Sequence, residues 1–264
     1  MASTNVYGDV AARVGGSAVA VTSLISDPAA DPHSYEANPQ NLLALSQADV
    51  IVENGGGYDD FVDTMLSSAN NAAAATINVV ELSGKAAAAG GELNEHVWYD
   101  FPTMGRFADA LASALSSRDP EDAATFAANA TAFKNDLAAL TRRETALAAV
   151  HSGAGVAVTE PVPLYLLEAA GLTNLTPPEF SEAIEEGTDV PVSALQATLA
   201  LFTSHQVALL AYNEQTAGPE TEQVKAAAVA NNIPVVPVTE TLPTGEDYIG
   251  WMSDNLSAIE TALR

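Results

Sequence analysis

One stretch of the chain, residues 121–150, contains neither glycine nor proline and is rich in alanine, leucine, arginine and glutamate. A run of about 30 such residues predicts a single helix about 45 Å long, at 1.5 Å per residue. Apolar residues recur along it every three to seven positions, namely Phe126, Ala130, Phe133, Leu137, Leu140 and Leu147. Their spacing predicts one apolar stripe along the whole helix. Because such a helix is longer than a small lobe is wide, we expect it to contact two lobes.

Short β-branched runs alternate with amphipathic patterns on both sides of this stretch. Strands are expected at residues 18–25, 49–52, 77–80, 156–159, 207–212 and 235–238. Helices are expected at residues 39–48, 58–69, 104–115, 162–170, 193–203, 220–231 and 248–263. This alternation is typical of βα units on a parallel sheet. The sequence therefore predicts two Rossmann-like α/β lobes, residues 1–118 and 151–264, joined by one long rigid helix at 119–150.

Charge and composition exclude several classes of function. Acidic residues outnumber basic ones by 34 to 9, which gives a formal net charge of −25. Such a chain repels phosphate backbones, so we expect no nucleic-acid partner. The sequence contains no cysteine, which excludes disulfides, thiolate metal sites and a cysteine nucleophile. No apolar run approaches the roughly 20 residues that span a bilayer. Any metal must therefore be held by histidine, aspartate or glutamate.

Four segments place a possible metal ligand just past a strand or in a loop between elements. His33 lies in DPHSYE and His96 in NEHVWYD, while Glu160 lies in VAVTEP and Glu240 in VPVTET. Each glutamate directly follows a β-branched run within a V-T-E triplet, and ligands of α/β proteins gather beyond the carboxyl ends of strands. Two imidazoles and two carboxylates form a mixed nitrogen and oxygen set that suits a divalent first-row metal.

Each of these residues also has a purely structural interpretation. Asp-Pro is a common turn opener, so His33 can be an exposed turn residue. His96 can be a half-buried histidine with satisfied ring nitrogens. Glu160 can be a carboxylate favoured by the start of a helix, and Glu240 a solvated loop acid. The joint placement of all four residues on two lobes favours the metal interpretation.

Several motifs follow one another along nearly the whole chain: DPHSYE, NGGGY, HVWYD, a long alanine-rich helix, TEPVPLYLLEAAGL and TETLPTGEDYIGWM. In this order and spacing they resemble the zinc- and manganese-specific solute-binding proteins of bacterial ABC importers, in the form found in high-GC Gram-positive bacteria. The resemblance implies two α/β lobes joined by a rigid backbone helix, with the metal held between the lobes. It also implies capture of Zn²⁺ or Mn²⁺ outside the membrane and delivery to a membrane ABC permease, without catalysis.

The resemblance assigns the ligands residue by residue. The two histidines of the family's first lobe correspond to His33 and His96. The third ligand, which is His in many zinc-type members and Glu in manganese-type members, corresponds to Glu160. The fourth, usually Asp, corresponds to Glu240. The loop at residues 83–95 lacks the histidine-rich stretch that zinc-specific members often carry. The absence of this stretch argues against a role dedicated to zinc.

The residues around these motifs are interpreted as support for the ligands: Tyr35, Glu36, Trp98, Asp100, Asn213 and Gln215. Asp100 is expected to cap the following helix. The resemblance further implies a protein of the cell surface, lipid-anchored through an N-terminal segment that this sequence lacks. We expect it to be a monomer.

Two other classes of function stay open. The same ligands can serve a metal-dependent hydrolase, although four protein ligands leave no position for a reactive water. The chain can also be a surface adhesin or a binding protein for a metal chelate. A chelate site favours a cleft lined by aromatic residues and arginine, and the four motif segments contain no arginine.

Overall fold

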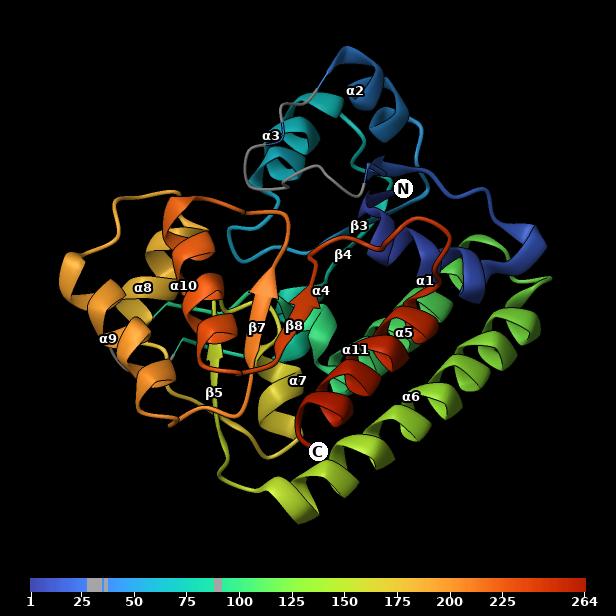
Figure 1. Cartoon of the computed structure of the whole chain (residues 1–264). Coiled ribbons are helices and arrows are strands. Elements are labelled where there is room, and N and C mark those ends of the chain that lie inside the picture. Colours follow the sequence, from blue (N-terminus) through green and yellow to red (C-terminus); the bar gives the residue numbers. More distant parts are fainter. Residues whose placement is uncertain (28–34, 36–37, 88–91) are drawn as a thin grey trace. The chain divides into compact units, whose positions relative to one another are not determined.

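A computed structural model gives the fold of the chain (Figure 1). The structure describes residues 1–27, 35, 38–87 and 92–264. Within this part of the chain no helix is both long enough and apolar enough to cross a membrane.

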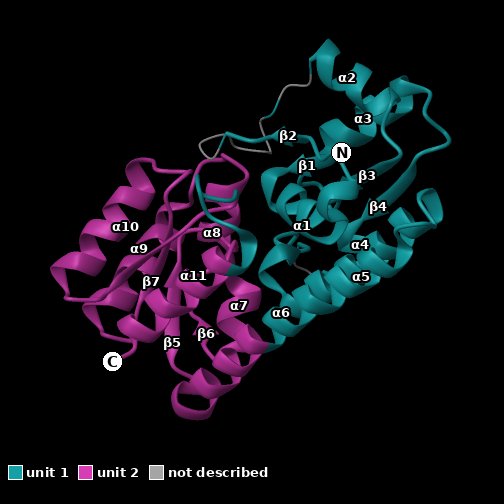
Figure 2. Cartoon of the chain, turned by 90° about the vertical axis from the view of Figure 1, so that its right-hand side faces the viewer, with its two compact units in different colours: residues 1–138, 241–249 teal, residues 139–240, 250–264 magenta. Residues whose placement is uncertain are grey.

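The chain divides into two compact units, which Figure 2 shows in different colours. Unit 1 consists of Met1–Ala138 and Thr241–Ile249, and unit 2 consists of Ala139–Glu240 and Gly250–Arg264. In the described residues each unit contains one parallel β-sheet of four strands. The predicted class of fold, two α/β lobes with a long helix between them in the sequence, is confirmed.

Unit 1 begins the chain. Its strands are β1 (Ala2–Thr4), β2 (Ser23–Ile25), β3 (Val50–Glu53) and β4 (Ala75–Asn78). Its helices are α1 (Asn5–Gly15), α2 (Pro39–Ser46), α3 (Asp60–Ala69), α4 (Val79–Ser83) and α5 (Phe101–Arg118), with short 3₁₀ turns at Gly16–Ala18 and Val97–Tyr99. The strands pair in parallel in the order β2-β1-β3-β4, and the β3–β4 pairing sets Glu53 opposite Asn78. Parallel pairing brings the carboxyl ends of all of these strands to one edge of the sheet.

The core of unit 1 consists of apolar side chains from the sheet and from the helices that pack against it. Leu45 of α2 packs with Val62 and Met65 of α3 against Ile51 of β3. Tyr7 of α1 meets Phe107 of α5 edge to face, with ring centroids 5.4 Å apart. All four residues of β3 are buried, as expected for a central strand covered on both faces.

The long helix is present as α6 (Ala123–His151). All six apolar positions of its predicted stripe are buried. Glu144 lies in the same stripe and is buried as well. The boundary between the two compact units, at Ala138 and Ala139, falls within this helix.

Unit 2 contains the second sheet. Its strands are β5 (Gly155–Val158), β6 (Thr173–Asn174), β7 (Leu210–Asn213) and β8 (Val235–Val238). Its helices are α7 (Leu164–Ala169), α8 (Pro178–Glu185), α9 (Val192–Thr203) and α10 (Pro219–Ala230), and α11 (Tyr248–Ala262) starts in unit 1 and continues in unit 2. The strands pair in parallel in the order β6-β5-β7-β8, so β7 lies between β5 and β8. Phe180, Phe202 and Tyr212 are large side chains of its core.

Several local expectations were wrong. The strand expected at 77–80 ends at Asn78, whose side chain caps α4 by accepting a hydrogen bond from the backbone N–H of Glu81. The strand expected at 18–25 is restricted to Ser23–Ile25. Helix α1 was not predicted. Helix α8 and strand β6 were missed because both are short.

Candidate metal-binding site

His96 projects from a tight backbone kink in unit 1. Its backbone angles are φ −73° and ψ 48°, and the N–H of Val97 donates to the carbonyl of Glu95 at 2.6 Å. These features define an inverse γ-turn with His96 at its centre. The side chain is completely buried. His96 therefore lies at the tip of a tight turn, outside any helix or strand.

Asn94 determines which ring nitrogen of His96 carries the proton. Its side-chain oxygen Oδ1 lies 3.0 Å from the backbone nitrogen of His96 and 2.8 Å from the ring nitrogen Nδ1. A backbone N–H can only donate, so the Asn94 atom that it meets must be the oxygen. Because this oxygen can only accept, Nδ1 carries the proton and Nε2 carries the lone pair. The neutral imidazole therefore offers Nε2 as a metal ligand.

Further contacts hold the turn in place. The side-chain amide of Asn54, at the carboxyl end of β3, donates to the carbonyl of Glu95 at 3.1 Å. The hydroxyl of Tyr248 donates to the carbonyl of Trp98 at 2.6 Å. The rings of Trp98 and Tyr58 meet the imidazole of His96 edge to face, with centroids 5.0 and 5.9 Å away. Hydrogen bonds along the backbone and contacts with two neighbouring aromatic rings thus hold His96 in its orientation.

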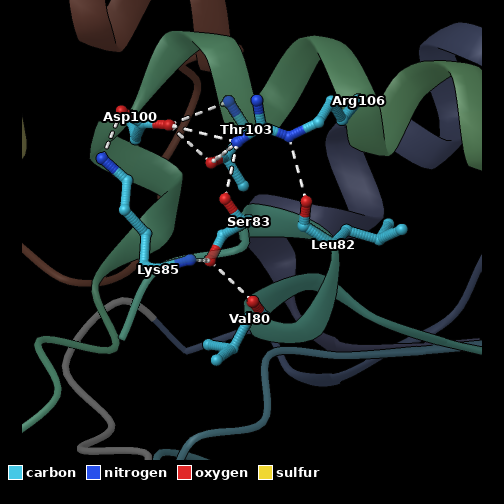
Figure 3. Close-up of polar contacts among 7 residues, drawn as sticks. All are labelled: Val80, Leu82, Ser83, Lys85, Asp100, Thr103 and Arg106. Carbon is cyan, nitrogen blue, oxygen red and sulfur yellow. Dashed lines mark hydrogen bonds and ion pairs between the residues drawn. The ribbon is translucent and has the colours of Figure 1, made fainter. Parts of the chain in front are cut away.

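A polar network anchors the two ends of the loop that carries His96 (Figure 3). Asp100 caps α5, as predicted, by accepting a hydrogen bond from the backbone N–H of Thr103 at 3.0 Å. Lys85 forms an ion pair with Asp100, with 3.0 Å between Nζ and Oδ1. Arg106 donates to the carbonyls of Leu82 and Ser83, each at 2.9 Å. These contacts join the end of α4 to the start of α5.

Three acidic side chains of unit 1, those of Glu53, Asp59 and Glu95, are buried. Burial raises the pKa of Glu53 from 4.5 to about 7, although the amide of Asn78 donates to its carboxylate at 3.0 Å. Burial likewise raises the pKa of Glu95 to about 7 and that of Asp59 above its ordinary value. Asp59 accepts hydrogen bonds from the backbone N–H groups of Asn54 and Gly55. It thereby stabilises the glycine turn that follows β3.

Glu160 and Glu240 follow the two strands that flank β7 in unit 2. Glu160 comes two residues after the end of β5 and Glu240 two residues after the end of β8. Both side chains are almost fully buried, with 2% and 3% of their surface exposed. Since β5, β7 and β8 run parallel, their carboxyl ends share one edge, and the two V-T-E triplets meet there on either side of Asn213.

Asn213 brings the two carboxylates together. Its Nδ2 donates to Oε2 of Glu160 and, at 2.8 Å, to Oε1 of Glu240. The backbone N–H of Gln215 donates to Oδ1 of Asn213 at 3.1 Å, so the oxygen and nitrogen of this amide are assigned without ambiguity. The side-chain oxygen of Gln215 accepts a hydrogen bond from the backbone N–H of Glu240 at 2.5 Å. Asn213 and Gln215 thus form hydrogen bonds with these glutamates, and their support of metal ligands stays a prediction.

The remaining predicted residues have different positions. His33 and Glu36 lie outside the described residues. The hydroxyl of Tyr35 donates to the carbonyl of Leu24 and accepts from the amide of Asn41, and its ring contacts Phe61. Sequence reasoning missed Asn94 and Asn54. An asparagine two residues before a histidine, and one directly before a glycine run, were the available signals.

The geometry offers two kinds of metal ligand. Unit 1 presents a neutral imidazole nitrogen with its lone pair set by Asn94, and unit 2 presents two buried carboxylates bridged by one neutral amide. Carboxylate oxygens and an imidazole nitrogen are ligands of Zn²⁺ and Mn²⁺. The net charge of −25 adds a long-range attraction for cations.

Residues 1–262 match the sequence profile of the family described as zinc-uptake complex component A, periplasmic, or ZnuA. The chain belongs to the ZnuA family. This membership, together with relatives named as manganese-binding and manganese ABC transporter substrate-binding lipoproteins, confirms the resemblance inferred from the motifs.

Individual relatives extend this comparison. The chain is 30% identical over 139 residues to the manganese-binding lipoprotein MntA of Halalkalibacterium halodurans, and the match covers 51% of this chain and 44% of that protein. The matched part thus spans less than half of that relative. The manganese ABC transporter substrate-binding lipoprotein ScaA of Streptococcus gordonii is 23% identical over 288 residues, covering 100% of this chain and 88% of that protein.

Solved structures of similar fold include FpvC from Pseudomonas aeruginosa in complex with Mn²⁺. It superposes with a TM-score of 0.81 at 21% identity, covering 99% of this chain and 96% of FpvC. A crystal structure of ZnuA gives a TM-score of 0.79 at 20% identity, with the same coverage. At these identities the likeness establishes the ZnuA-family fold alone.

Proposed function

We propose that this protein is the extracytoplasmic binding component of a bacterial ABC importer and that its cargo is one Zn²⁺ or Mn²⁺ ion. The ligands would be His33, His96, Glu160 and Glu240. The observation that carries this proposal is the pair of buried carboxylates that Asn213 holds together at the carboxyl edge of the second sheet. Membership of the ZnuA family and relatives named as metal-transport lipoproteins support it.

The partner would be the membrane permease of the same importer, and the bound metal would be handed over unchanged. Relatives are named lipoproteins, which supports a surface location with a lipid anchor. We further propose that the protein is a monomer and catalyses no reaction. With four protein ligands, the site lacks the open position that catalytic zinc sites keep for water.

Zinc should bind more tightly than manganese, whichever ion the cell imports. The Irving–Williams order places Zn²⁺ above Mn²⁺ for nearly every nitrogen and oxygen site. Two carboxylates make the set harder than a three-histidine site, which makes Mn²⁺ binding feasible as well.

Isothermal titration of the metal-free protein with Zn²⁺ and with Mn²⁺ tests the proposal. We expect one ion per chain and a loss of at least 100-fold in affinity in His96→Ala, because no other nitrogen of the turn replaces Nε2. The same loss is expected in His33→Ala, and a smaller one in Glu240→Ala, which leaves three ligands that can recruit water. His205→Ala changes an exposed histidine outside the motifs and serves as the matched control.

Two results would refute the proposal. One is unchanged stoichiometry and affinity in the double variant His33→Ala, His96→Ala. The other is metal-dependent hydrolysis of ester, phosphate or peptide substrates by the wild-type protein that disappears in Glu160→Ala, which would establish the hydrolase instead.

A further inference from the structure

Both the oxygen and the nitrogen of the Asn213 side-chain amide form hydrogen bonds at the carboxyl edge of the second sheet. Its Oδ1 accepts from the backbone N–H of Gln215, and Nδ2 donates to Glu160 and to Glu240. An amide nitrogen has two hydrogens, so each carboxylate receives one of them. Asn213 is itself 1% exposed, and its backbone N–H donates to the hydroxyl of Thr159 at 2.9 Å. It therefore has no freedom to turn away from the carboxylates.

The hydrogen bonds involve one oxygen of each carboxylate, Oε2 of Glu160 and Oε1 of Glu240. An oxygen that accepts a hydrogen bond is a weaker metal ligand, because part of its lone-pair density is already engaged. A carboxylate that chelates a cation through both oxygens would have to share or give up this bond. The second oxygen of each group, Oε1 of Glu160 and Oε2 of Glu240, is not contacted by Asn213.

We propose that Asn213 is a positioning residue that determines metal selectivity by restricting Glu160 and Glu240 to one ligating oxygen each. This inference rests on the proposed function. Two imidazoles and two single oxygens make four ligands, the number that Zn²⁺ prefers. Mn²⁺ favours more oxygen ligands, which chelation by either carboxylate would supply. The amide therefore favours zinc over manganese without touching the metal.

The test compares Asn213→Ala, which removes both donors, with Asn213→Ser, which keeps one hydroxyl donor. Asn255→Ala is the matched control, since Asn255 is a buried asparagine of unit 2 whose amide contacts Met252. The affinities for Zn²⁺ and Mn²⁺ are measured by titration. The visible spectrum of the Co²⁺-loaded protein reports coordination number, because four-coordinate Co²⁺ absorbs far more strongly than five- or six-coordinate Co²⁺.

We expect the ratio of Zn²⁺ affinity to Mn²⁺ affinity to fall at least tenfold in Asn213→Ala, with a weaker Co²⁺ absorption, and to fall less in Asn213→Ser. Wild type and Asn255→Ala should share one ratio and one spectrum. An unchanged ratio and spectrum in Asn213→Ala would overturn the inference and leave the proposed function standing. If Asn213→Ala does not fold, an unchanged ratio and spectrum in Asn213→Ser overturns it equally. Failure of the wild type to bind any of these metals would refute the proposed function itself, and this inference with it.

Discussion

In unit 1 the amide of Asn54 donates to the backbone carbonyl of Glu95, whereas in unit 2 the amide of Asn213 donates to the carboxylates of Glu160 and Glu240. Both asparagines stand at the carboxyl end of the third strand in the sheet order, β3 in one unit and β7 in the other. The first amide stabilises a turn that carries a candidate ligand, and the second contacts the candidate ligands themselves. In unit 1 a side chain thus holds the backbone of the turn that carries His96. In unit 2 the side chains of Asn213, Glu160 and Glu240 hold one another in place.

The largest effect on stability is expected from Asn54→Ala. Asn54 is completely buried, its Oδ1 accepts from the hydroxyl of Tyr7, and its Nδ2 donates to Glu95. Removing the amide leaves those buried groups without this partner, so the free energy of unfolding should fall by about 3 kcal/mol in urea denaturation. Zinc and manganese affinities should fall by the same factor, because His96 is displaced but the number of ligands is unchanged. A selectivity change like that expected for Asn213→Ala would erase the distinction between the two asparagines.

The variant Glu53→Gln tests whether the acid at the end of β3 affects stability and not metal binding. Its pKa of about 7 means that the native state holds a proton that the unfolded state releases near pH 4.5. The free energy of unfolding should therefore fall as the pH rises between these values. Glu53→Gln keeps an acceptor for Asn78 and should stabilise the protein by about 2 kcal/mol at pH 8, with no difference below pH 4.5.

Glu121→Gln, at an exposed acid of unit 1 ahead of α6, is the control for Glu53→Gln and should show neither effect. Metal affinity should be unchanged in both variants, whereas Glu160→Gln should weaken metal binding. Loss of metal affinity in Glu53→Gln would contradict the proposed division between structural acids of unit 1 and metal-ligating acids of unit 2.

Asn94→Ala should weaken zinc binding at least tenfold, or about 1.4 kcal/mol, because Nδ1 of His96 loses the acceptor that sets its tautomer. Asn94→Asp keeps an oxygen at this position and should restore most of the affinity. Titration of the two variants side by side measures the difference. Equal affinity in wild type and Asn94→Ala would show that unit 1 needs no side chain to prepare its ligand, which would sharpen the contrast with unit 2.

The smallest effect is expected from Lys85→Met. The Lys85–Asp100 pair is partly solvated, with a third of the lysine side chain exposed. Breaking it should cost less than about 1 kcal/mol in thermal unfolding. Asp100→Ala should cost more, about 1 to 2 kcal/mol, since it also removes the cap of α5. If both variants are equally damaging, the ion pair contributes more to the His96 loop than its exposure indicates.

Local patterns predicted the parts of the fold that local physics governs. The stripe that includes Phe126 and Phe133 marks the buried side of α6, because a helix repeats every 3.6 residues wherever it lies. The β-branched runs located β5 and β8, and the triplets after them placed Glu160 and Glu240 at strand ends. The strand expected at 77–80 was wrong at its end, because capping by Asn78 starts a helix that hydrophobicity alone does not reveal.

Motifs and composition also limit the chemistry that the chain can perform. A chain without cysteine, with an excess of acids and with the DPHSYE and HVWYD motifs, leaves imidazole and carboxylate as its metal ligands. No local pattern predicts the strand order, in which β7 lies between β5 and β8.

The sequence by itself thus determined the long helix, most of the strands and the types of candidate ligand. Only the tertiary structure decided that Asn213 bridges two carboxylates that lie 53 and 27 residues away, and that Asn54 supports a turn 41 residues away. These contacts depend on which strands pair and on where each chain segment returns to the sheet. The strand order depends on how much apolar surface the whole lobe buries, so no single segment of the sequence determines it.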